Sequence, residues 1–118
     1  MNNLRILVSS FMLLLLCGCN IDVDVTPGGR VISDPSLIDC RSNGGTCFVE
    51  DYEDLDLEVE DLIVTFRALP DENYVLDRWE GDCEETIANK CYVVLGDDVY
   101  VKAIFKPIAY AVGSGQTK

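Results

Sequence analysis

The chain has 118 residues, of which 21 are Asp or Glu, nine are Lys or Arg and none is His, so its formal charge is −12. A chain this acidic lacks the basic surface that nucleic-acid phosphates require, and we expect no nucleic-acid partner. Without histidine, and with its serines in turn-like or terminal positions, the sequence offers no nucleophile–base pair. We therefore expect no enzymatic activity, no catalytic residue and no cofactor.

The N-terminal segment has the features of a secretion signal. Arg5 supplies the positive charge, and the apolar run Ile6–Leu16 has the length of a signal core. That run is shorter than the stretch of about 20 apolar residues that crosses a bilayer as a helix. We expect residues 1–18 to form a helical signal peptide and the rest of the chain to be exported.

The end of this signal resembles the bacterial lipobox. In Leu16-Cys17-Gly18-Cys19 a leucine and two small residues precede a cysteine. The resemblance implies that the thiol of Cys19 receives diacylglycerol and that a peptidase cleaves just before it. The alternative is an ordinary secretory signal with Cys19 as a free or paired thiol. Lipidation is favoured because the apolar core and the motif agree in position.

Lipidation would make the membrane the first partner of this protein. Three acyl chains, as the resemblance implies, anchor a protein firmly. Loss of residues 1–18 removes Arg5 and no acid, so the formal charge becomes −13 and attachment has to come from the lipid. Asn20 is not the Asp that marks lipoproteins for inner-membrane retention. We therefore expect a place in the bacterial cell envelope, at the outer membrane.

Four cysteines then remain in the mature chain: Cys40, Cys47, Cys83 and Cys91. In a small exported domain, four cysteines indicate two disulfides. The spacing within each pair is wider than in structural zinc sites, so we expect no metal. Asn43-Gly44 favours a two-residue hairpin turn that sets Cys40 opposite Cys47. Cys83 is then left to pair with Cys91.

The segment Glu50–Asp61 contains eight acidic residues out of twelve. Its alternation predicts an edge strand with one acidic face, followed by a bulge or turn at Glu60-Asp61. We favour a solvated edge that discourages edge-to-edge pairing. A calcium-dependent surface module using residues 50–61 is the alternative function. A row of carboxylates along a strand does not surround one ion, however, and the run lacks the glycine of an EF-hand loop.

Later segments alternate apolar and polar residues as half-buried strands do, and helical periodicity is absent outside the signal. The predicted fold class is mainly β, a small antiparallel module with two local disulfides. We expect Cys19 and a short tether over residues 19–28, the β-rich domain over 29–107, and a flexible tail over 108–118. Large apolar side chains such as Trp79 are expected to pack in the core.

The order of motifs from Gly29 to Lys106 resembles the internalin-type B-repeat, also called the bacterial repeat domain. The most specific portions are Trp79-x-Gly81-x-Cys83, the strand after Cys91, and Val101-x-Ala103-x-Phe105. The resemblance implies a β-grasp-like module without catalytic residues. It also implies a spacer or adhesive role at the bacterial surface.

Together these features predict a non-enzymatic envelope lipoprotein, a membrane-anchored binding or structural module with a protein or glycan partner. Strand alternation predicts one face opposite the core, near Arg67 and Lys102, as a partner site: Tyr92, Val94, Tyr100 and Ile104. The alternative is that Ile108 and Tyr110, or a second layer, cover this face. An exposed apolar patch with aromatic residues is typical of a partner site.

Overall fold

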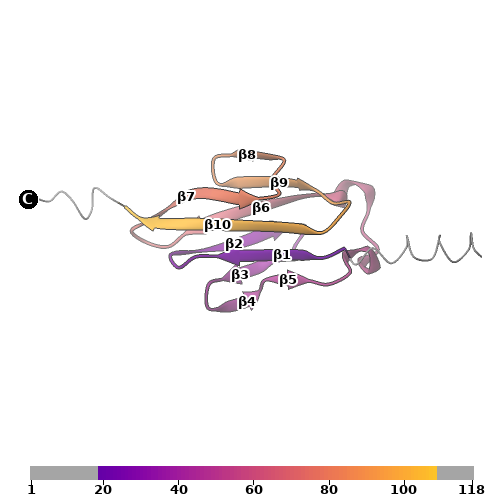
Figure 1. Ribbon diagram of the computed structural model, residues 1–118, viewed down its shortest axis with the longest axis horizontal. Coiled ribbons are helices and arrows are strands. Elements are labelled where there is room, and N and C mark those ends of the chain that lie inside the picture. The colour runs from indigo at the N-terminus through magenta and orange to yellow at the C-terminus, as the bar shows by residue number, and fades with distance from the viewer. Residues whose placement is uncertain (1–18, 109–118) are drawn as a thin grey trace, which may run out of the picture.

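The computed structural model describes residues 19–108, which fold into two packed β-sheets (Figure 1). The strands are β1 (Ile21–Val25), β2 (Gly29–Asp34), β3 (Asp39–Arg41), β4 (Gly44–Thr46), β5 (Phe48–Val49), β6 (Ile63–Pro70), β7 (Tyr74–Gly81), β8 (Glu85–Ile87), β9 (Lys90–Val94) and β10 (Val99–Pro107). The four-stranded sheet has the order β5-β1-β10-β7, and the six-stranded sheet has the order β4-β3-β2-β6-β9-β8. The predicted mainly β class is confirmed. The predicted signal peptide and residues 109–118 of the predicted tail lie outside the described residues.

The core lies between the two sheets. Strands β1 and β10 alternate buried and more exposed residues, and so do β2 and β6 of the other sheet. Apolar side chains from both inner faces form one cluster that includes the fully buried Ile21, Val31, Val64, Phe66 and Val101. Trp79 packs against this cluster, as predicted. Burial of such side chains is the main stabilising term for a domain of this size.

The predicted tether is wrong for residues 21–25, because they form strand β1. This strand runs parallel to β10, from Ile21 opposite Val99 to Val25 opposite Ala103. Its alternate residues Ile21, Val23 and Val25 belong to the core. The sequence Ile-Asp-Val-Asp-Val has the period of a half-buried strand, and β10 provides the partner that only the folded chain reveals. The module is therefore not purely antiparallel as predicted. A parallel pair needs a long connection, and almost the whole domain lies between β1 and β10 in the chain.

Both predicted disulfides are confirmed. Cys40 is bonded to Cys47 and Cys83 to Cys91, with Cα–Cα distances of 4.8 Å and 5.4 Å. The predicted register of the first hairpin is wrong, however, because Cys40 lies opposite Gly45 rather than Cys47.

The turn of this hairpin is shifted toward the N-terminus relative to the prediction. Arg41 pairs with Gly44, so the two connecting residues are Ser42 and Asn43. Gly45 has φ +101°, and a Cβ there would lie 2.4 Å from the carbonyl oxygen of Asp39. The missing side chain lets the backbone pass close to β3 and brings Cys47 back over Cys40.

Removal of either disulfide should weaken the fold without abolishing it. The bridges close loops with sequence separations of only 7 and 8 residues. Chain-entropy arithmetic for loops of this size gives about 2–2.5 kcal/mol each. We expect the double variant Cys40→Ser/Cys47→Ser to lose about that much unfolding free energy in urea, with Cys83→Ser/Cys91→Ser showing a similar loss. Complete unfolding of either variant at room temperature would show that the bridge does more than restrain the unfolded chain.

The predicted edge strand in the acidic run is also wrong. This segment forms two 3-10 helices, η1 (Tyr52–Leu55) and η2 (Val59–Leu62). The residues on either side of η1, Asp51 and Asp56, adopt left-handed backbone conformations with φ 50° and 57°, which a strand does not contain. The turn predicted at Glu60-Asp61 lies within η2, which ends where β6 begins.

The buried side chain of Tyr52 anchors this segment. The alternation of apolar and acidic residues did not predict its burial. Tyr52 is 5% exposed, its backbone N–H donates to the Cys19 carbonyl at 2.9 Å, and its hydroxyl donates to the Asp97 carbonyl at 2.8 Å. Burial raises the pKa of this hydroxyl. The contacts of Tyr52 bend the chain into helical turns, which leaves Val59 81% exposed rather than on an inner face.

Candidate functional sites

The first candidate site is the predicted anchor, Cys19, which lies at the beginning of the fold. Cys19 is 5% exposed and belongs to the core cluster. Asn20 is held on both sides: its N–H donates to the Asp98 carboxylate at 2.9 Å, and its side-chain oxygen accepts from the Asp51 N–H at 2.9 Å. Strand β1 follows at once, so no free linker separates Cys19 from the domain.

Chemistry at Cys19 has a clear requirement. The Cys19 sulfur is disulfide-bonded in the structure, and formation of a thioether at this atom requires the reduced thiol. Within residues 19–108 the structure contains no helix with the length and apolar character needed to cross a membrane.

The second candidate site, the predicted partner face, is divided between two surfaces. Tyr92 and Val94 lie on β9 of the six-stranded sheet, whereas Tyr100 and Ile104 lie on β10 of the four-stranded sheet. The prediction of one shared face is therefore wrong. Alternation identified side chains that are not on the inner faces, since Val94 is 56% and Tyr100 41% exposed and the other two are half-buried. The alternation did not show that the chain passes from the six-stranded to the four-stranded sheet between Val94 and Val99.

Ile108 and Tyr110 were the residues expected to cover the predicted partner face in the alternative reading. The Ile108 N–H donates to the Asn73 carbonyl at 2.9 Å, which holds Ile108 beside the start of β7. Tyr110 lies outside the described residues.

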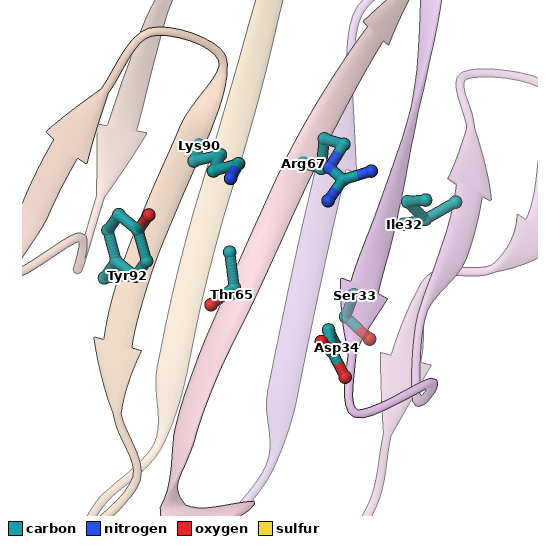
Figure 2. A pocket seen from close by; sticks show the side chains of 7 residues that line it. All are labelled: Ile32, Ser33, Asp34, Thr65, Arg67, Lys90 and Tyr92. Atoms are coloured by element: carbon teal, nitrogen blue, oxygen red, sulfur yellow. The ribbon is translucent and has the colours of Figure 1, made fainter.

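A cavity of about 340 Å³ lies on the outer face of the six-stranded sheet (Figure 2). Three neighbouring strands, β2, β6 and β9, supply its lining: Ile32, Ser33, Asp34, Thr65, Arg67, Lys90 and Tyr92. The register sets Arg67 opposite Lys90 and Thr65 opposite Tyr92. On the other side of β6, Ile32 lies opposite Arg67 and Asp34 opposite Thr65. Six of the seven lining residues thus form two parallel rows, one of Lys90, Arg67 and Ile32 and one of Tyr92, Thr65 and Asp34.

Sequence reasoning had placed Tyr92 and Arg67 near each other but had missed Lys90, Thr65, Asp34 and Ile32. The spacing of Lys90 two residues before Tyr92 was available as a signal, because residues i and i+2 of a strand share a face. The pairing of β2 with β6 was not available from local patterns.

One end of this sheet is occupied by ordinary ion pairs. Arg30 donates two hydrogen bonds to the Asp39 carboxylate, both at 2.8 Å, and these bonds hold the pKa of Asp39 below its usual value. Arg41 lies 3.3 Å from Asp71. Pairs this exposed add little to stability, but they show that cations elsewhere on the sheet are neutralised locally.

The acidic run offers no visible metal centre. No three Asp, Glu or Cys side chains come together as metal ligands among residues 19–108. The acidic residues of η1 and η2 instead lie on the surface of the domain.

Comparison with protein-family models, with curated proteins and with solved structures finds no match to this chain.

Proposed function

We propose that this protein is a non-enzymatic lipoprotein of the bacterial envelope that holds one β-rich binding module at a membrane. The observation that supports the proposal best is the position of Cys19 directly before strand β1, with only Asn20 between them. The lipobox-like motif predicts a mature N-terminus at Cys19, and Cys19 is a buried member of the core cluster.

Lipidation at Cys19 would set the module close to the membrane. Only Asn20 separates Cys19 from β1, and one extended residue spans about 3.5 Å. The acyl chains would therefore hold the domain directly against the membrane. The strands run along the long axis of the molecule from this end (Figure 1), so both outer faces would stand away from the membrane and be open to partners.

The type of module remains part of the proposal. The resemblance to the bacterial repeat domain, and the spacer or adhesive role that it implies, rests on the motif order from Gly29 to Lys106. The two disulfides predicted from the cysteines within this stretch are present in the structure. The β-grasp-like arrangement has less support, because residues 19–108 contain no α-helix.

Metabolic labelling with palmitate, followed by membrane fractionation and intact-mass measurement, tests the proposal. We expect a labelled, membrane-bound chain that begins at Cys19 and carries the added acyl mass. An unlabelled chain cleaved at another residue and recovered in the soluble fraction would contradict it.

The calcium-dependent alternative can be tested separately. We expect millimolar calcium to raise the melting temperature no more than an equal ionic strength of sodium chloride does, because the carboxylates of the acidic run do not converge. A calcium-specific stabilisation that disappears in Asp54→Asn/Asp56→Asn would favour the calcium module instead.

A further inference from the structure

Two cations lie side by side on the outer face of the six-stranded sheet. Arg67 on β6 and Lys90 on β9 are direct cross-strand neighbours. The residues that flank this pair in the same row are apolar, Ile32 on β2 and Ile87 on β8. Neither cation has a carboxylate within 4.0 Å among residues 19–108, whereas Arg30, Arg41, Arg78 and Lys106 all do.

Lys102 on β10 also lacks a salt bridge among the described residues, but its surroundings differ from those of Arg67 and Lys90. Its two cross-strand neighbours are Asp24 and Glu80. Its charge is thus balanced by the sheet itself. Arg67 and Lys90 have no acid directly opposite them. Asp34 and Glu85 lie one row away, and Asp39 lies beyond Ile32 in the same row, where it pairs with Arg30.

This arrangement runs against the charge of the chain. Like charges directly opposite each other destabilise a sheet. A chain with more than twice as many acidic as basic residues has ample carboxylates to separate two cations, yet here it brings two of them together. Departures from local rules are expected where a protein keeps a residue for function rather than for stability.

A cavity lies beside this pair of cations. Arg67 and Lys90 lie along one side of it, and Tyr92, Thr65 and Asp34 form the adjacent row (Figure 2). An arginine and a lysine together bind a carboxylate through charge-assisted hydrogen bonds. Thr65 and Asp34 can exchange hydrogen bonds with hydroxyl groups, and the ring of Tyr92 offers an amphipathic surface.

We infer that this cavity binds a carboxylate-bearing sugar unit of an acidic polysaccharide. The sugar carboxylate lies between Arg67 and Lys90, and the ring packs on Tyr92 with its hydroxyls toward Thr65 and Asp34. This inference names the ligand of the binding module proposed above and so rests on that function.

The test uses the full-length chain in detergent micelles, so its outcome does not depend on lipid labelling. The probe is a trimer of galacturonic acid, titrated at millimolar concentration while the backbone amide signals are followed by NMR. We expect saturable shifts centred on β6 and β9 that weaken as salt is added. Arg67→Gln and Lys90→Gln should each weaken binding about tenfold or more, as loss of a charge-assisted contact does.

Lys102→Gln is the matched control, and it should change the affinity by less than about twofold because it lies on the other sheet. The two site variants should also melt no lower than the parent chain, since each removes a like-charge contact. Four results would overturn the inference: no saturable shift with the acid trimer, equal binding of a neutral galactose trimer, equal binding of triglutamate, or equal weakening by Lys102→Gln.

Discussion

The Cys19→Ala variant is expected to lose palmitate labelling completely. In the proposed route the thioether would form at the sulfur of this residue, which alanine lacks. Because the peptidase of the lipoprotein route acts after lipidation, the variant should keep residues 1–18 or be released without lipid. The substitution also removes the disulfide of Cys19, but the domain should stay folded. The Cys19 carbonyl that accepts from the Tyr52 N–H is kept, and the Cys40–Cys47 and Cys83–Cys91 bridges are untouched.

Cys17→Ala is the matched control for this experiment. It changes a cysteine two residues earlier and keeps a small side chain before the predicted cleavage point. We expect normal labelling and membrane partition for this variant, measured by the same fractionation. Label retained by Cys19→Ala, or lost equally from Cys17→Ala, would refute the assignment of Cys19 as the lipid-bearing residue.

Local patterns predicted most of the strands because burial on one face leaves a direct mark on the sequence. The alternation over Val64, Phe66 and Ala68 corresponds to the inner face of β6, and that over Val99, Val101 and Ala103 to the inner face of β10. The disulfide pairs were also predictable, since both join cysteines close in the chain. Such features depend on neighbours in sequence, which a single chain displays.

The parts that could not be predicted depend on distant partners. Nothing near Ile21 shows that β10, almost eighty residues later, will pair with it. In the same way, nothing between Val94 and Val99 shows that the chain leaves one sheet for the other. The acidic run was misread for a related reason, because the contacts of Tyr52 with Cys19 and Asp97 outweigh its local alternation.

The candidate sites follow the same division. The lipobox-like motif is contiguous, so Cys19 could be proposed from four residues. The outer-face cavity needs three strands in a fixed register, and a shift of one residue would turn Arg67 or Lys90 to the other face. That is why the sequence identified Tyr92 and Arg67 as near a partner face but did not join them to Lys90 and Asp34.

The second large effect is expected at the start of the fold, in Ile21→Ala. Ile21 is fully buried, and it packs in the common core from a strand that had been predicted as a tether. Truncation of a buried isoleucine to alanine costs about 2–5 kcal/mol through lost burial and the cavity left behind. Small domains have about 5–15 kcal/mol of net stability, so the urea midpoint should fall markedly at an unchanged slope.

Asp22→Ala, one residue later on the exposed face of the same strand, is the matched control. It lacks an ion pair among the described residues, and we expect its unfolding free energy to change by about 0.5 kcal/mol or less. If Ile21→Ala proved as mild as Asp22→Ala, residues 21–25 would be a tether after all, and the lipid would hold the domain on a flexible linker. A large difference between the two variants would place a core residue, Ile21, two positions after the predicted anchor.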